Sequence, residues 1–184
     1  MQMKKFFSLF VLAALAVVCA ADDGQKNNLI KCGDFDHPVH GKRHMGGAGQ
    51  AWSGVGKTTH LFVDKEIFVT KGASLRLESG CEAVRQTIPV EPDKQYKLSF
   101  SVRTKDLTPG LRIMIRFGGN PAPSLYTLGD YRDYIRGTAD WQKVEKTFRT
   151  PKEFGTQYKP HIEFFIGKST GKCWIDHVEL VEVK

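Results

Sequence analysis

The chain has 184 residues, of which 41% are hydrophobic and 26% are charged, with 18 glycines and 8 prolines. This balance is that of a globular protein of one domain, and it excludes disordered, collagen-like and low-complexity classes. The formal charge of +7 is spread without long runs. Such a charge suits an acidic glycan or simple solubility, and it gives little support to a nucleic-acid partner.

Residues 1–21 have the three-part layout of a secretory signal peptide. Lys4 and Lys5 precede an apolar run over residues 6–18, and small residues follow it. We expect cleavage there and a secreted or extracytoplasmic protein, in the periplasm or at the cell surface. Lipidation at Cys19 is the alternative, but the bulky Val17 and Val18 before it argue against a lipoprotein signal. Without Lys4 and Lys5, the mature chain has a formal charge of +5. Residues 22–27 are then a short linker, and residues 28–184 form one domain.

Three cysteines remain in the mature chain, Cys32, Cys81 and Cys173. In an oxidising compartment they allow one disulfide and a free thiol, or three free thiols. Cys32 and Cys173, near the first and last expected strands, are the first pair to test, and the pairing stays open. None of the spacings is typical of a zinc site.

Alternation of apolar and polar residues dominates the mature chain. It is clearest over residues 73–78, 96–103, 111–117 and 161–166. A period of two predicts half-buried strands, and Gly- and Pro-containing turn signals separate them. The sequence therefore predicts an all-β fold, an antiparallel β-sandwich. Residues 37–57 and 120–139 do not alternate, and we expect them to be long functional loops.

Motifs for other functions are weak. Residues 51–58 fit a loose phosphate-loop pattern, but no strand signal precedes them and no helix signal follows, so we expect no nucleotide. His37, His40 and His44 lie in a Gly-rich segment without the frame of a metal site, and a solvated loop is favoured. No nucleophile elbow or opposed carboxylate pair occurs, so we predict that the chain is not an enzyme.

The polar faces of the strands carry more information. If the strands around Leu75, Phe100, Ile113 and Phe164 share one sheet, their outward face carries arginines, one carboxylate and apolar platforms: Arg76, Arg103, Arg112, Arg116, Glu163, Met114 and Phe165. Guanidinium donors and aromatic rings suit sugar hydroxyls and sugar rings. The alternative is a solvated face whose charges pair with one another.

The tryptophans and loop tyrosines receive different predictions. Trp141 and Trp174 stand at strand starts and are expected in the core. Trp52 has no apolar pattern around it and is expected to be exposed. For the loop residues Tyr126, Tyr131 and Tyr134, the core and the surface remain equally open.

Several segments resemble the carbohydrate-binding modules of the CenC-like type (families 4, 9, 16 and 22). They are residues 28–36 (NLIKCGDFD), 72–77 (GASLRL), 96–103 (YKLSFSVR), 141–148 (WQKVEKTF) and 171–180 (GKCWIDHVEL). The resemblance covers residues 28–183 and implies a jelly roll similar to the galactose-binding-like fold, with a sugar groove on one face. It also implies a structural calcium, for which Asp36 and Asp176 match the acids of the family pattern. The alternative is that both acids cap turns. Cys32 and His177 depart from that pattern, which has Asn and often Asp there.

The resemblance implies a non-catalytic domain that binds a polysaccharide or oligosaccharide. Trp52, near the position of a groove tryptophan, would stack on the sugar with Tyr126, Tyr131 and Tyr134. Polar contacts would come from Arg103, Arg116 and Glu163. Cell-envelope components or a glycoside hydrolase are further expected partners, and nucleic acid and nucleotides are not. The alternative function is a protein-interaction or envelope-structural sandwich without a sugar groove.

Overall fold

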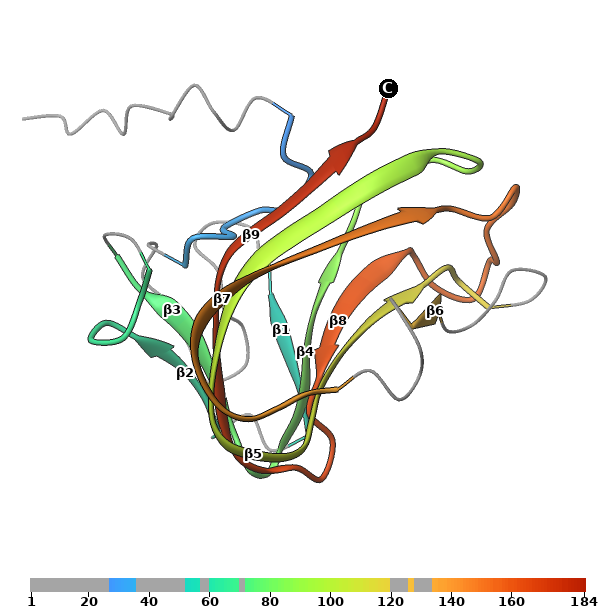
Figure 1. Ribbon diagram of the computed structural model, residues 1–184. Helices are drawn as coiled ribbons and strands as arrows, with labels where there is room; N and C mark the ends of the chain where they lie inside the picture. The colour runs from blue at the N-terminus through green and yellow to red at the C-terminus, as the bar shows by residue number, and fades with distance from the viewer. Residues whose placement is uncertain (1–26, 36–51, 57–59, 70–71, 120–125, 128–133) are drawn as a thin grey trace, which may run out of the picture.

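The computed structural model describes residues 27–35, 52–56, 60–69, 72–119, 126–127 and 134–184 (Figure 1). For Tyr126 and Thr127 it describes the backbone alone. The predicted signal peptide, nearly all of the linker, the three loop histidines, Asp36 and Tyr131 lie outside these residues, so what we expect of them stays a prediction. In the described part, no helix is long and apolar enough to cross a membrane.

Within the described residues, nine strands make up the fold. They are β1 (Ser53–Gly56), β2 (Leu61–Asp64), β3 (Ser74–Glu78), β4 (Cys81–Thr87), β5 (Gln95–Arg116), β6 (Tyr126–Thr127), β7 (Ile135–Arg149), β8 (His161–Phe165) and β9 (Thr170–Glu182). Every pairing between them is antiparallel. The predicted all-β antiparallel fold is therefore confirmed.

The strands form two layers that share the long strand β5. In the first layer, β1, β4, β8, the end of β5 and β6 lie side by side. In the second layer, β2, β3, β9, the start of β5 and β7 do so. Figure 1 shows β5 running through the lower end of the view, where it passes from one layer to the other. The result is a sandwich whose layers are continuous through one strand.

The continuity of β5 corrects an expectation. The turn signal at Thr108, Pro109 and Gly110 separated two predicted strands, yet both belong to β5. The pairing of β5 with β7 continues past this point, from Leu107↔Gly137 to Leu111↔Ile135, with irregular register. Gly110 has a φ of 138°, and a Cβ there would lie 2.7 Å from the carbonyl oxygen of Ile135. The turn residues thus bend the strand rather than end it, since a bulged strand can change sheets at such a position.

Side chains from both layers fill the core between them. Phe100 from the second layer and Phe164 from the first meet edge to face, with ring centroids 5.1 Å apart. Leu75, Leu98 and Ile115 are fully buried beside them. These are the apolar positions of the alternating pattern, so the period of two correctly predicts which residues enter the core.

The opening segment is fixed to β9 by Asn28 and Gly33. The Asn28 amide donates to the carbonyl of Val178, and its side-chain oxygen accepts from the backbone N–H groups of Ile30 and Leu180. A Cβ on Gly33 would clash with the Val178 carbonyl oxygen. The Asn-Leu and Gly of the family-like opening motif are therefore structural: they attach the start of the domain to its last strand.

The three described cysteines are free thiols. Cys32 is half-buried in the opening segment, and Cys81 and Cys173 are buried. Burial raises the pKa of the Cys81 thiol to about 11, and it also raises the pKa of the Cys173 thiol. Of the two possibilities left open by the sequence, the structure has three free thiols, without the Cys32–Cys173 bridge.

Candidate functional site

A groove of about 1260 Å³ lies on the outer face of the first layer. We call this surface the groove face. Because paired residues of antiparallel strands share a face, three rows of side chains cross it. One row is Thr87, His161 and Arg116; the next is Ser53, Arg85, Glu163 and Met114; the third is Val55, Ala83, Phe165 and Arg112.

Glu163 lies at the centre of the groove face, between two cationic or ionisable neighbours. Its Oε2 accepts a hydrogen bond from Nε of Arg116 at 3.1 Å, and Nε2 of His161 lies 3.8 Å from the same oxygen. The Glu163 side chain is only 6% exposed. Burial alone would raise the pKa of this carboxyl, but His161 and Arg116 outweigh it and hold the pKa below its ordinary value. Glu163 is therefore a fixed carboxylate that orients Arg116.

Three further cations line the groove: Lys31, Arg85 and Lys159. All three are exposed. Within the described part of the chain, none of them forms an ion pair with a carboxylate. Lys31 is held at its backbone, where its N–H and carbonyl both bond to the Gln86 amide. Their charges therefore face the solvent of the groove.

Aromatic residues of this face are partly covered. The guanidinium of Arg112 lies 4.9 Å from the centroid of the Phe165 ring and 5.2 Å from that of Tyr134. Tyr158 lines the groove and contacts the His161 ring, with centroids 5.4 Å apart. Tyr134 thus lies beside the face through Arg112, whereas the side chains of Tyr126 and Tyr131 lie outside the described residues.

The prediction that Trp52 is exposed is wrong. Trp52 is 1% exposed and packs against Phe35 and Phe164, at centroid distances of 5.7 and 5.8 Å. Its Nε1–H donates to the carbonyl of Cys32. Its partners come from distant parts of the chain, so no local apolar pattern marks it as a core residue. A ring so buried has no face on which a sugar could stack.

The prediction that one sheet face carries all five expected charged residues is also wrong. Arg112, Arg116 and Glu163 lie on the groove face, but Arg76 and Arg103 lie on the outer face of the second layer. The error arises because the strands around Leu75 and Phe100 belong to the other layer. Of the predicted polar contacts, the structure brings Arg116 and Glu163 together and places Arg103 on the opposite side.

We call the outer face of the second layer the back face. One row there is Phe62, Arg76, Trp174 and Arg103. Trp174 is buried as expected, and its Nε1–H donates to Asp64. Trp141, also expected in the core, is only half-buried, so that expectation is wrong. Arg103 lies 5.7 Å from the Trp174 centroid and pairs with Asp140 at 3.5 Å. A smaller cleft of about 500 Å³ adjoins them.

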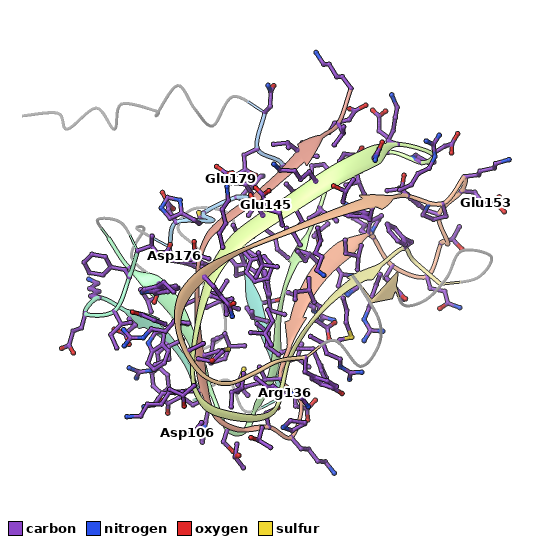
Figure 2. The ribbon with its side chains drawn as sticks, in the orientation of Figure 1. Asp106, Arg136, Glu145, Glu153, Asp176 and Glu179 are labelled. Carbon is purple, nitrogen blue, oxygen red and sulfur yellow. The ribbon has the colours of Figure 1, made fainter. Side chains whose placement is uncertain are left out.

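The calcium expectation has one acid in the described part of the chain. Figure 2 shows Asp176 on β9, and it is 1% exposed. Its Oδ2 accepts from the Val69 N–H and its Oδ1 from its neighbour's N–H. Among the described residues, no three His, Cys, Asp or Glu side chains gather as a metal cluster. Asp36 lies outside them, so the calcium site stays a prediction.

Sequence reasoning missed four residues of the groove: Lys31, Arg85, Tyr158 and His161. Arg85 and His161 could have been found, since each lies on the polar side of an alternating segment. Lys31 and Tyr158 lie outside the strands, and only the fold brings them to the groove.

Comparison with known proteins agrees with this architecture. Residues 31–180 match the family model CBM_4_9_1, described as "BppA domain 1". Among curated proteins, no sequence matches the chain.

Solved structures of similar fold include "Family 16 Carbohydrate Binding Module-2", with a TM-score of 0.58 and 17% identity over 84% of this chain and all of that one. "CBM4 structure and function" has a TM-score of 0.57 and 19% identity, over 84% of this chain and 99% of that one. The CBM22-1 xylan-binding domain of Xyn10C from Paenibacillus barcinonensis has a TM-score of 0.52 and 15% identity, over 82% and 92%.

At these identities the solved structures establish the fold alone. The family model covers most of the chain and agrees with the sandwich and its opening motif. The chain therefore belongs to the CBM_4_9 family of carbohydrate-binding modules.

Proposed function

We propose that this protein is a secreted, non-catalytic domain that binds a polysaccharide along the groove face. The observation that carries the proposal is the groove itself, about 1260 Å³ in volume, with charged and aromatic side chains on adjacent rows. Family membership supports carbohydrate as the ligand class, and the predicted signal peptide supports secretion.

Glu163 and Arg116 fit the polar part of this function. Arg116 uses its Nε–H on Glu163, and a guanidinium carries five N–H donors in all. The carboxylate holds the guanidinium of Arg116 in one orientation. Ligand binding therefore loses little further side-chain entropy at this residue. Sugar hydroxyls would then accept from Arg116 and Arg85 and donate to Glu163.

Phe165 and Tyr158 fit the apolar part. Both line the groove, and aromatic rings suit the C–H face of a sugar. They replace Trp52 in the proposed role of a stacking surface. A structural calcium bound by Asp36 and Asp176 is a separate proposal, in which the ion would tie residues near the opening segment to β9.

A glycan array followed by calorimetry on the best ligand tests the function. Arg85→Ala should weaken binding by about tenfold or more, as expected for a central contact. The matched control is Arg103→Ala, which removes an arginine from the back face and should leave affinity unchanged. Neither arginine is buried, so thermal melts should confirm that both variants fold.

Two results would contradict the proposal. If no plant, algal or mucin glycan binds, the sandwich serves a protein-interaction or structural role instead. If Arg103→Ala weakens binding while Arg85→Ala does not, the ligand occupies the back face.

A further inference from the structure

The groove carries more positive than negative charge. Its lining includes four permanent cations, Lys31, Arg85, Arg116 and Lys159, against two carboxylates, Glu82 and Glu163. Glu163 is already neutralised by Arg116, and its side chain is 6% exposed. The charge that a ligand meets is therefore mostly positive.

Arg85 is the cation best placed to meet a ligand anion. It lies opposite Glu163 in the middle row, with Ser53 on its other side. Within the described residues no carboxylate pairs with it, so its guanidinium donors remain available. A planar guanidinium binds a carboxylate or sulfate through two parallel hydrogen bonds, which is its strongest pairing geometry.

Arg116 provides a second position on the same face. It lies on β5, and β8 separates it from Arg85 on β4. Two strand spacings put the backbones roughly 10 Å apart, so the two arginines can contact different units of an extended chain. Lys31 and Lys159 add exposed charge elsewhere along the same groove.

Stacking has less to offer in the described part of this groove. Trp52 is in the core, and the Phe165 ring is partly covered by the Arg112 guanidinium. A neutral polysaccharide needs open aromatic platforms, whereas an anionic one gains most from charge complementarity.

From these observations we infer that the groove selects an anionic polysaccharide, whose carboxylate or sulfate groups pair with Arg85 and Arg116. This inference rests on the proposed function and names its ligand class. Neutral chains of the same backbone bind more weakly because their hydroxyls leave the groove cations without counter-charges.

Matched polymer pairs test the inference by calorimetry at two salt concentrations. The pairs are polygalacturonate and its methyl ester, carboxymethyl cellulose and hydroxyethyl cellulose, and dextran sulfate and dextran. At least one anionic member should bind about tenfold more tightly than its neutral partner, with affinity falling as salt rises. The first two pairs report carboxylates and the third reports sulfate.

A double variant separates the groove from general charge attraction. Lys31→Gln with Lys159→Gln should reduce anionic-glycan affinity about fivefold and leave neutral-glycan affinity within about twofold. The matched control is Lys65→Gln with Lys168→Gln, two exposed lysines outside the groove lining, and it should bind like the wild type.

Three outcomes would overturn the inference. If neutral members bind as tightly as anionic ones, the proposed function stands and the anionic selectivity fails. If both double variants lose affinity equally, the attraction comes from net charge rather than from the groove. If no polymer binds, either charged or neutral, the proposed function fails with the inference.

Discussion

The groove face and the back face contain the same residue types, but their charged side chains are paired differently. Each face has a buried carboxylate, arginines and an aromatic ring in paired rows. On the back face, Asp64 accepts from Arg76 at 2.7 Å and from Trp174 at 2.9 Å, and Glu78 lies within 3.5 Å of both Arg76 and Lys172. On the groove face, Glu163 pairs with Arg116, and Arg85 is left without a described carboxylate partner.

The difference is between a face whose charges are satisfied within the protein and a face that leaves described cations without a carboxylate partner. A carboxylate that accepts from both an arginine and a tryptophan satisfies its own face and leaves little for a ligand. A face with excess exposed cations keeps donors that bond to water in the free protein and can bond to a ligand instead. The number of unmatched donors, rather than the number of arginines, distinguishes a binding surface from a solvated one.

The largest expected effect is on the back face. Asp64→Ala removes the acceptor of Trp174 and Arg76, and also of the backbone N–H groups of Glu66 and Ile67. Breaking a buried ion pair costs about 3 to 5 kcal/mol. Because Arg76 is partly exposed, we expect the lower end of that range, a loss of about 3 kcal/mol in the free energy of unfolding measured with urea. Glycan affinity should not change in the folded variant. A loss of less than about 0.5 kcal/mol would show that this network is not structural.

Glu163→Gln should have a smaller effect on stability, about 1 kcal/mol at neutral pH, because Gln keeps one acceptor for Arg116. It should also strengthen anionic-glycan binding about threefold, because it removes a negative charge from the groove and leaves Arg116 without a counter-charge. The same variant of a site for neutral sugars would weaken binding instead, so the sign of the change in affinity separates the two cases.

The effect of pH follows from the same carboxylate. The folded-state pKa of Glu163 lies below its ordinary value of 4.5, so its contribution to stability is complete above that value. The contribution is lost as the pH falls through the folded-state pKa. Urea unfolding of wild type and Glu163→Gln from pH 7 to pH 3 should give a difference that is constant above about pH 5 and shrinks below it. A constant difference throughout would contradict this account.

Calcium should stabilise the fold if Asp36 and Asp176 bind it. At about a hundred times its Kd, the ion would add roughly 2.7 kcal/mol, seen as a higher Tm that EDTA reverses. Asp36→Asn should abolish this shift. An unchanged melting curve in millimolar calcium would remove the ion from the account.

The smallest expected effect concerns the thiols. Burial raises the pKa of Cys81 to about 11, so at neutral pH it is almost wholly protonated and unreactive. Iodoacetamide should modify neither Cys81 nor Cys173 in the native protein, and it should modify both of them and Cys32 after unfolding, as mass spectrometry would show. Modification of Cys81 or Cys173 in the native state would contradict the buried free thiols. A protein mass lower by two hydrogen atoms, which indicates a disulfide bond, would also contradict them.

The strands could be predicted from the sequence better than their arrangement in the two layers. Alternation around Leu98 and Ile113 follows from local side-chain periodicity, so both core positions could be predicted. The passage of β5 through both layers could not, because Pro109 and Gly110 look the same in a bend as in a turn. Because β5 passes from one layer to the other at this bend, Arg103 and Arg116 lie on opposite faces of the sandwich.

The candidate site was predictable only where local pattern and long-range pairing agree. Glu163 is central on its own strand and central on the sheet. Trp52 shows the opposite case, because Phe35 and Phe164 bury it from distant positions. Arg85 lies on an alternating strand, so its position on the polar face could be predicted. That it has no carboxylate partner could not, because this depends on Arg116 pairing with Glu163, which faces Arg85 from β8.

Amide NMR of the ¹⁵N-labelled domain, titrated with short oligogalacturonates, compares the two faces most directly. The account predicts that shifts concentrate on β4, β8 and the last residues of β5, around Arg85, Glu163 and Arg116. Shifts that instead concentrate on β3 and β9, around Arg76 and Trp174, would place the ligand on the back face and contradict it.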